Sequence, residues 1–522
     1  MFKKSSCLAF ALTLAALFLP TSLLAGEHSL VLNLRNRVEL GEKGSGLFNV
    51  QWKTVEWDAS KTALVICDMW DKHWCPNSTT RVGEMAPRMN QLAAEARKRG
   101  ALIIHCPSDT MEYYKEWPQF KLAQDAPTAE AKSPLQRWRK IDLTHESPLP
   151  IDDTQGGCDC DEPVKNYRAW SHQIDSIKIE ATDAITDSAQ AYHLMRQRGI
   201  ENVLVMGVHL NMCVLGRPFS IRQLCAQGLN VALVRDMTDT MYNPRAKPFV
   251  SHFTGTDLMV EHVEKFWCPS VTSVDILGGK EFRFADDKRP HILIVSAEDE
   301  YKTSETLPAF ALKYLGTDYK VSYVFGGLKG EHRLQGLEQI DDADALLLSV
   351  RRRVLQKDQF DHVRKFIAAG KPVIGIRTAC HAFAPAKNEK VPDDCDAWMA
   401  FDKEVLGCNY NNHYPAGDKT QISAAEHAKE NPILKGVEPT EFASSGSLYK
   451  VAPLEPKTIP LLNGVTKDKP AECVAWTFTR ENGGRVFSTT LGHPDDFTLP
   501  QFEKLLRNGI DWAVGKTAKK NE

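Results

Sequence analysis

The sequence predicts an α/β protein with two domains, each a mostly parallel sheet with helices on both faces. Short apolar runs rich in β-forming residues recur along the chain, and amphipathic helical stretches separate them. This alternation is typical of βαβ units, which bury a parallel sheet between helical layers. At 522 residues the chain also exceeds the size of one ordinary domain. We expect domains at residues 26–285 and 286–522, after a different segment at 1–25.

The elements follow in order from these patterns. A helical stretch that ends in Arg97-Lys98-Arg99 is followed by Gly100, which fits a helix C-cap. Another helix is expected near residues 187–198. The expected strands are 62–67, 101–106, 202–206 and 230–235 in the first half, and 291–295, 321–325, 345–348, 372–376, 473–476 and 485–489 in the second. Residues 107–170 show weak periodicity and predict a long insertion over the edge of the first sheet.

Residues 1–25 are typical of a secretory signal peptide. Lys3 and Lys4 precede an apolar run at 7–19, and the segment ends in the small residue Ala25. The run is too short for a comfortable membrane span. We therefore expect cleavage after Ala25, an exported (periplasmic or secreted) protein, and no membrane attachment of the mature chain.

The composition and net charge limit which kinds of binding partner are expected. The hydrophobic content of 43%, the charged content of 25% and the net charge of −3 are ordinary for a soluble protein and give no electrostatic case for nucleic acid. A small-molecule substrate is the expected partner, and a homo-oligomer is compatible with the sequence.

The chain has 13 cysteines, and cleavage would remove Cys7. No spaced CxxC…CxxC pattern is present, so we expect no metal and no cofactor. Export would permit disulfides, with Cys158 and Cys160, or Cys395 and Cys408, as candidate members. Four others lie in apolar patterns and are read as buried core residues: Cys67, Cys106, Cys225 and Cys473.

The candidate catalytic residues of the first domain lie at the ends of two predicted strands. The strand at 202–206 runs into Gly207-Val208-His209-Leu210-Asn211-Met212-Cys213, and the strand at 62–67 ends in Asp68. Ligands bind outside the carboxyl ends of strands in open parallel sheets. A helix start at Cys213 would lower the pKa of its thiol, and a neighbouring carboxylate would handle its proton.

Residues 58–265 resemble the isochorismatase-like cysteine hydrolases on the strength of Asp68 and the Gly207-to-Cys213 turn. The resemblance implies that Cys213 attacks a C–N carbonyl and that Asp68 carries the proton. It also implies that the backbone N–H groups of His209 and Cys213 form the oxyanion hole and that the Val208–His209 peptide is cis.

The resemblance implies a catalytic lysine too. Lys178 has a suitable spacing, 35 residues before Cys213, although it equally fits an exposed strand; Lys165 and Arg168 are alternatives. The Asp-x-His metal cluster of nicotinamidases is missing after His105, so a catalytic metal is not expected. Four residues are expected to line the substrate site, although core packing is the commoner role for such tryptophans: Trp70, His73, Trp74 and Arg217.

Residues 289–517 resemble the trehalose-utilisation (ThuA-like) family, a branch of the class I glutamine amidotransferase-like fold. The resemblance rests on residues 371–377, 485–493 and 502–513. Arg377 stands where the amidotransferases have their nucleophilic cysteine, so a polar ligand bound by Arg377, His381 and His493 is favoured over catalysis. A displaced trio of Cys380, His493 and Asp495 is the alternative.

Together these features predict an exported hydrolase that cleaves a C–N (amide or ureide) bond through a cysteine thioester. The second domain is expected to bind a ligand. The rival interpretation is a secreted binding protein that keeps both folds without the chemistry, for instance for a carbohydrate-derived ligand.

Overall fold

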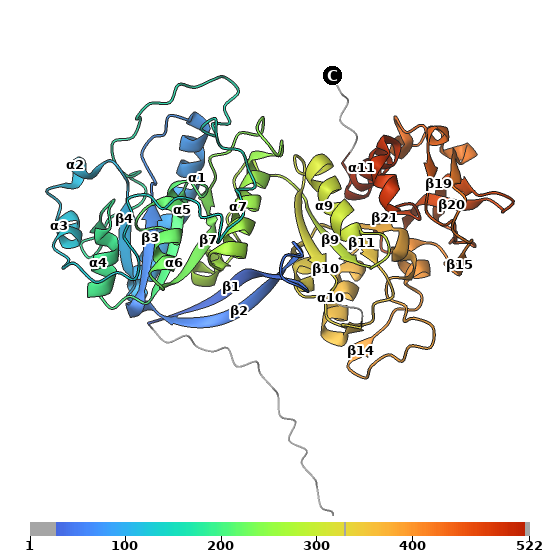
Figure 1. Ribbon diagram of the computed structural model, residues 1–522, viewed down its shortest axis with the longest axis horizontal. Coiled ribbons are helices and arrows are strands. Elements are labelled where there is room, and N and C mark those ends of the chain that lie inside the picture. The colour runs from blue at the N-terminus through green and yellow to red at the C-terminus, as the bar shows by residue number, and fades with distance from the viewer. Residues whose placement is uncertain (1–27, 328–329, 517–522) are drawn as a thin grey trace, which may run out of the picture.

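The computed structural model describes residues 28–327 and 330–516, which form two sheets, each flanked by helices (Figure 1). The predicted fold class is confirmed. The expected signal peptide at 1–25 lies outside the described residues. The division between residues 285 and 286 stays a prediction, with one sheet on either side of it.

The first sheet combines a parallel centre with an antiparallel hairpin at one edge. β1 pairs antiparallel with β2 and with β8, and the remaining neighbours are parallel. The strand order is β2 (Phe48–Asp58), β1 (Ser29–Glu39), β8 (Ser270–Val271), β7 (Asn230–Asp239), β6 (Asn202–Val208), β3 (Thr62–Cys67), β4 (Leu102–Cys106) and β5 (Ala184–Ile185).

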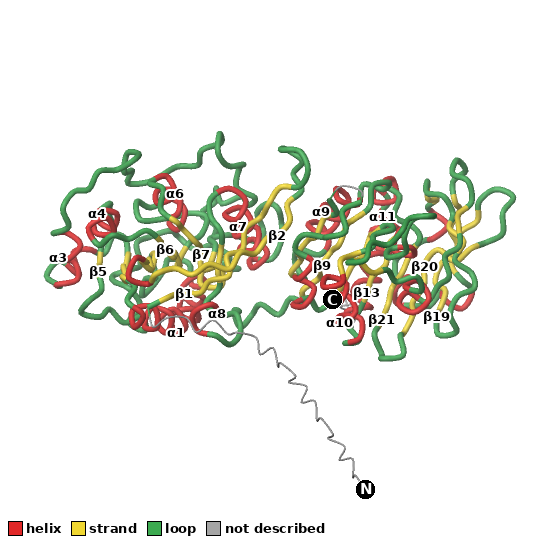
Figure 2. Tube along the Cα trace, turned by 90° about the horizontal axis from the view of Figure 1, so that it is seen from below, coloured by secondary structure: helices red, strands yellow, loops and turns green. Residues whose placement is uncertain are grey.

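Helices cover both faces of this sheet (Figure 2). One face packs against α1 (Pro76–Arg99) and α8 (Val274–Leu277). The other face packs against α4 (Gln190–Gln197), α5 (Cys213–Gly216), α6 (Ile221–Ala226) and α7 (His252–Phe266). Gly100 caps α1 with a φ of 109°, as its sequence predicted.

The β1–β2 hairpin was not predicted, and it reaches from the first sheet to the second. At its far end the Asn49 side chain donates to the Phe325 carbonyl and accepts from the Phe325 amide, both at 2.8 Å and both buried. β2 thereby lies along β10 (Lys320–Phe325), the edge strand of the second sheet. A buried pair of hydrogen bonds between one side chain and the backbone of the other sheet ties the two sheets together.

The second sheet is parallel from β10 to β21 and antiparallel beyond. α9 (Thr303–Tyr314) and α11 (Pro500–Val514) cover one face, and α10 (Lys357–Ala368) covers the other. Its strand order is β10 (Lys320–Phe325), β9 (His291–Ala297), β11 (Ala345–Val350), β13 (Val373–Ile376), β21 (Arg485–Thr489), β20 (Glu472–Thr479), β19 (Thr458–Val465), β16 (Thr420–Ala424) and β17 (Ala443–Ser444). Two small pairs, β12 (Leu355–Gln356) with β14 (Cys395–Asp396) and β15 (Asn412–His413) with β18 (Tyr449–Lys450), lie outside it.

The insertion begins with two short helices, α2 (Met111–Tyr114) and α3 (Pro118–Gln124). From there to β5 the described chain forms no further helix or named strand. Glu146 anchors this stretch: its buried carboxylate accepts from Arg222, His262 and Trp267 at 2.7–2.9 Å. Burial opposes ionisation of Glu146, but these hydrogen bonds and the Arg222 charge hold its pKa at about 2.

Candidate active site

Asp68 and the Cys213 turn meet because they follow neighbouring parallel strands. Cys67, the last residue of β3, lies opposite Gly207 of β6. The approach is so close that a Cβ on Gly207 would lie 2.0 Å from the Cys67 carbonyl oxygen. Gly207 also has a φ of 117°, which side chains disfavour. Glycine is therefore required for the two strand ends to meet.

Asp68 presents one carboxylate oxygen that the protein holds and one that it leaves without a hydrogen bond. The residue is fully buried and adopts a φ of 48°. Its Oδ1 accepts from the Ser108 amide at 2.8 Å. Among the described residues no donor makes a hydrogen bond of full geometry to Oδ2, although that atom is buried, and the Cys213 thiol interacts with the same carboxylate. An unsatisfied buried carboxylate oxygen is costly, and it suits a group that exchanges a proton.

Arg217 supplies the positive charge beside Asp68. Its Nε lies 3.5 Å from Asp68 Oδ2, close enough for an ion pair but without hydrogen-bond geometry, since Nε also lacks a hydrogen-bond partner among the described residues. The guanidinium also pairs with Asp109 at 3.3 Å and lies over the Trp138 ring. We expected Arg217 only as a lining residue. Its position four residues after Cys213, one helical turn further along the chain, is the sequence feature that could have indicated this role.

Cys213 is the first residue of α5 and is only 9% exposed. Burial raises the pKa of its thiol well above the usual value, the Asp68 charge raises it further, and Arg217 opposes both. The expected lowering of this pKa is wrong, because α5 is only four residues long and the thiol is desolvated. At neutral pH the sulfur is thus a thiol beside a base. Burial also raises the pKa of Asp68, again against Arg217.

Lys178 does not join this group. It lies in an exposed stretch that forms no strand, and its Nζ donates to the Asp175 carbonyl at 2.9 Å. The exposed strand that Lys178 equally fitted does not form either, because the segment bonds to α1 through Asn90 instead of pairing with a sheet. Lys165 and Arg168 are exposed as well. The cation that contacts Asp68 is therefore Arg217.

The turn before Cys213 has the geometry that the resemblance implied. The Val208–His209 peptide is cis, which confirms that prediction. Among the described residues the structure records no hydrogen-bond partner for the His209 and Cys213 amides. The His209 imidazole points elsewhere, with Nε2 2.7 Å from Ser78 Oγ, and burial lowers its pKa to about 3. The ring is thus neutral at physiological pH.

The expected aromatic lining is packed within the protein. Trp70 stacks on Trp170 at 4.4 Å between ring centroids, and its indole N–H donates to the Ser108 carbonyl. His73 stacks against the same Trp170, and burial lowers the His73 pKa to about 4. Trp74 is 8% exposed. These rings form a wall beside the site, with their faces largely occupied by one another.

The residues expected to bind a ligand in the second domain gather at the ends of β13 and β21. Arg377 is buried between the rings of Tyr301 and Tyr449, and its Nη1 donates to the Thr490 carbonyl at 2.7 Å. Tyr449 links it to His381, and Tyr301 links it to His493. Arg377 Nε and His381 Nδ1 are buried and have no hydrogen-bond partner among the described residues.

Cys380 is not arranged as a nucleophile. It is 2% exposed, and its sulfur lies 3.9 Å from that of Cys408. The two cysteines proposed as disulfide members therefore have different neighbours. Cys408 lies beside Cys380, and the Cys395 thiol faces Asp394. Among the presumed core cysteines, Cys67 and Cys106 are fully buried, whereas Cys225 and Cys473 are half-buried.

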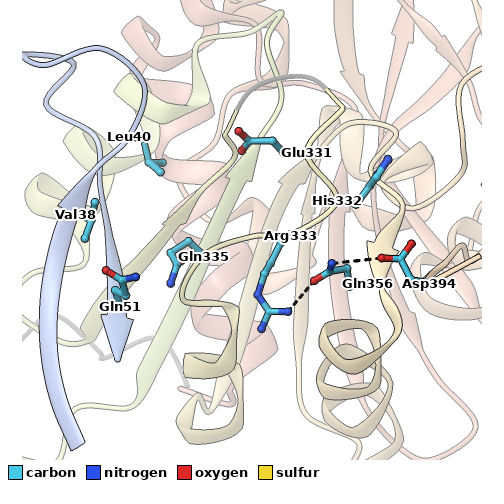
Figure 3. Close-up of a pocket in the computed structure, with 9 residues that line it drawn as sticks. All are labelled: Val38, Leu40, Gln51, Glu331, His332, Arg333, Gln335, Gln356 and Asp394. Carbon is cyan, nitrogen blue, oxygen red and sulfur yellow. Dashed lines mark hydrogen bonds between the residues drawn. The ribbon is translucent and has the colours of Figure 1, made fainter. Parts of the chain in front are cut away.

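A separate cavity of about 410 Å³ lies where the hairpin meets the second domain (Figure 3). Within it Arg333 donates to Gln356 at 2.8 Å. Its lining includes no residue predicted to be functional: Val38, Leu40, Gln51, Glu331, His332, Arg333, Gln335, Gln356 and Asp394.

In the described part of the chain, no helix has the length and apolar character needed to cross a bilayer.

Comparisons with known proteins gave a family match for the C-terminal part of the chain and several structural matches at low identity. Residues 291–513 match the model of the ThuA family, described as trehalose utilisation. A search of curated proteins found no match. Among solved structures, a ThuA-like protein from Bacteroides uniformis is 14% identical, covering 46% of this chain and 97% of its own, with a TM-score of 0.33.

Two further solved structures match at similar coverage. A cysteine hydrolase from Pseudomonas syringae is 13% identical over 42% of this chain and 92% of its own, with a TM-score of 0.27. An isochorismatase family protein from Burkholderia thailandensis is 16% identical over 42% and 94%, with a TM-score of 0.24. Because the ThuA family model matches residues 291–513, the C-terminal part of the chain contains a ThuA domain.

Proposed function

We propose that the first domain is a hydrolase that cleaves a C–N bond, of the amide or ureide type, in a small molecule through a thioester on Cys213. One observation carries the proposal: a buried thiol adjoins an ion pair between buried Asp68 and half-buried Arg217, and the facing atoms of that pair have no hydrogen-bond partner in the described protein. A nucleophile, a base and a cation in one desolvated place are what covalent acyl transfer requires.

The first half-reaction forms the thioester. As the Cys213 sulfur bonds to the substrate carbonyl carbon, its proton passes to Asp68, so a free thiolate is not needed beforehand. The negative charge that develops on the carbonyl oxygen is received by the His209 and Cys213 amides, each donor contributing about 3–4 kcal/mol. The C–N bond then breaks, and the proton on Asp68 leaves with the amine.

The second half-reaction returns the enzyme to its starting state. Asp68 takes a proton from water as the water oxygen bonds to the thioester carbon. The C–S bond breaks, the acid is released, and the proton returns to the Cys213 sulfur. Throughout, Arg217 keeps Asp68 ionised when it must act as a base, because its charge opposes the effect of burial on the Asp68 pKa.

The test is a screen of the full-length mature protein for ammonia or amine release from a library of amides and ureides. Cys213→Ala is expected to abolish release and the covalent acyl adduct on this cysteine, which mass spectrometry detects. Cys380→Ala, which removes a buried sulfur in the other domain, is expected to retain both. Release that persists in Cys213→Ala would refute the mechanism and favour the non-catalytic alternative.

We further propose that the ThuA domain binds a hydroxyl-rich ligand beside Arg377, His381 and His493. Two unpaired buried nitrogens support it, Arg377 Nε and His381 Nδ1. Most other guanidinium donors of Arg377 already make hydrogen bonds to protein atoms. His493, the more exposed residue, would therefore make the direct contact with the ligand. Thermal shifts with a panel of sugars should appear in the full chain and disappear in His493→Ala.

A further inference from the structure

Three cysteines that are distant in sequence converge beside the first domain's sheet. Cys75 lies just before α1, and Cys158 and Cys160 lie in the insertion. All three sulfurs lie within 4.8 Å of one another, and those of Cys75 and Cys160 are 3.8 Å apart. Cys75 is buried and the other two are half-buried. The cluster takes no part in the proposed hydrolysis.

The spacing of the sulfurs fits a tetrahedral metal ion. With Zn–S bonds of about 2.3 Å, two ligands of one zinc ion stand about 3.8 Å apart. A disulfide needs only two sulfurs, at about 2.05 Å, and would leave the third thiol of this cluster unused. Three soft donors around one point are the arrangement that zinc selects.

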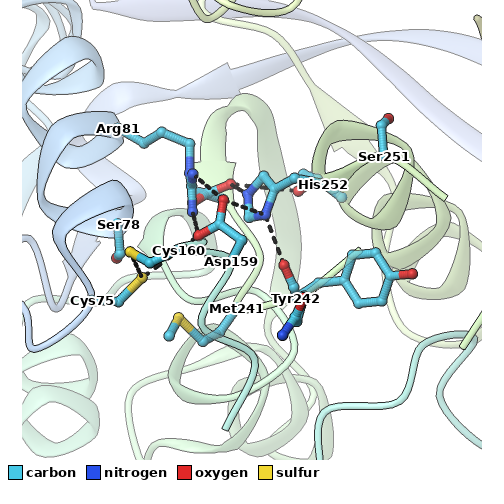
Figure 4. A network of polar contacts seen from close by, with 12 residues as sticks. Cys75, Ser78, Arg81, Asp159, Cys160, Met241, Tyr242, Ser251 and His252 are labelled. Carbon is cyan, nitrogen blue, oxygen red and sulfur yellow. Dashed lines mark hydrogen bonds and ion pairs between the residues drawn. The ribbon is translucent and has the colours of Figure 1, made fainter. Parts of the chain in front are cut away.

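An ion network holds the segment between the two insertion cysteines in place (Figure 4). Asp159 accepts from Arg81 at 2.8 and 3.2 Å, and Arg81 in turn donates to Asp239 at 2.7 Å. His252 bridges Asp239 and the Tyr242 carbonyl. Both oxygens of Asp159 are engaged, so this residue positions its neighbours, as outer residues do around metal ligands.

We propose that Cys75, Cys158 and Cys160 bind one Zn²⁺ ion as three thiolates, with water in the fourth position. On binding, each thiol gives its proton to solvent and forms one Zn–S bond, so no electron is transferred. Solvent reaches the site because Cys158 and Cys160 are half-exposed.

The structural role of this ion would be to fasten the insertion to the start of α1. From the end of α3 to β5 the described chain makes no helix or named strand, and ordering such a stretch costs conformational entropy. The cluster also packs with Met212, the neighbour of Cys213, so the ion would brace the wall of the candidate active site. Neither the sequence separation of Cys75 nor the short C-x-C spacing is a zinc pattern, so no metal could be expected here from the sequence.

The test measures zinc in the full-length protein by elemental analysis, after reconstitution under reducing conditions and desalting. We expect one ion per chain in the wild type, loss in Cys75→Ser and Cys160→Ser, and retention in the control Cys395→Ser, whose thiol faces Asp394. Should the variants fail to fold, chelation of the wild type is expected to speed proteolysis within residues 125–183, and added Zn²⁺ to reverse it.

Two results would overturn the proposal. One is a reconstituted wild type with substantially less than one zinc per chain. The other is a disulfide between any two of the three cysteines in protein isolated from its native compartment, found by mass spectrometry without reduction. Neither readout uses turnover, so this inference stands or falls separately from the proposed hydrolase activity.

Discussion

The reactivity of Cys213 offers a test that needs no substrate. Asp68 and Arg217 shift the thiol pKa in opposite directions, upward and downward respectively. Neutralising them one at a time should therefore change the alkylation rate of this one cysteine with opposite signs. Iodoacetamide reacts with the thiolate fraction of a cysteine, unlike the proton-coupled attack proposed for the substrate. Asp68→Asn should therefore speed this alkylation, and Arg217→Gln should slow it. General loosening of the site would speed both.

The size of the effect follows from the charges. A carboxylate about 4 Å from a thiolate disfavours it by about 4 kcal/mol at an effective dielectric constant of about 20. Roughly half of this is offset because thiolate nucleophilicity falls with pKa. The remainder, about 2 kcal/mol, corresponds to about a 30-fold faster alkylation in Asp68→Asn. For Arg217→Gln we expect about a tenfold slower reaction, since Arg217 lies 3.5 Å from Asp68 and part of its charge is spent on that pair.

The assay follows modification of the Cys213 peptide by mass spectrometry at pH 8, with the other cysteines of the same chain as internal standards. Lys178→Gln is the matched control, because its exposed amine donates to the Asp175 carbonyl and not to Asp68, and its rate should equal that of the wild type. Equal acceleration in Asp68→Asn and Arg217→Gln would refute the electrostatic reasoning. A slower rate in Lys178→Gln alone would restore the lysine that the resemblance implied.

Three further predictions concern stability and processing. Gly207→Ala should lower Tm by about 5–10 °C or prevent folding, because its Cβ would meet the Cys67 carbonyl at 2.0 Å, whereas Gly83→Ala has open space and should not; equal Tm values would contradict the packing argument. Glu146 has a folded pKa of about 2 against a usual 4.5, so its stabilisation is full above pH 4.5 and lost as pH falls toward 2. In acid unfolding followed by tryptophan fluorescence, Glu146→Gln should flatten this dependence, and an unchanged slope would count against it. Terminal sequencing of exported protein should begin after Ala25; an intact N-terminus would contradict the signal peptide.

Local patterns in the sequence were sufficient to predict the central strands. The run at Thr62–Cys67 is apolar throughout and is buried throughout, since a central parallel strand is covered on both faces. The hairpin of β1 and β2 escaped prediction because its outer strand alternates weakly and is exposed along most of its middle. Its function as a link depends on Phe325, far away along the chain.

In the candidate site, too, some residues could be predicted from the sequence and others could not. Asp68 and Cys213 could be located from the sequence, because each lies at a strand end or in a turn of a few residues. The cis peptide at Val208–His209 was expected only from the family resemblance, since no residue pattern predicts it. The cation could not be located from the sequence, since Lys178 and Arg217 both have suitable charge and only packing decides which one reaches Asp68. The raised thiol pKa likewise reflects burial by segments remote in sequence.

What the sequence determined by itself is therefore the central strands of each sheet and the two residues at neighbouring strand ends, because hydrophobic periodicity and turn chemistry act over short stretches of chain. What only the tertiary structure decided is which charges and sulfurs meet across long separations: Arg217 at Asp68, and Cys75 at Cys158 and Cys160. Those meetings depend on how the insertion folds over the sheet, where burial and ion pairs between distant segments outweigh any local preference.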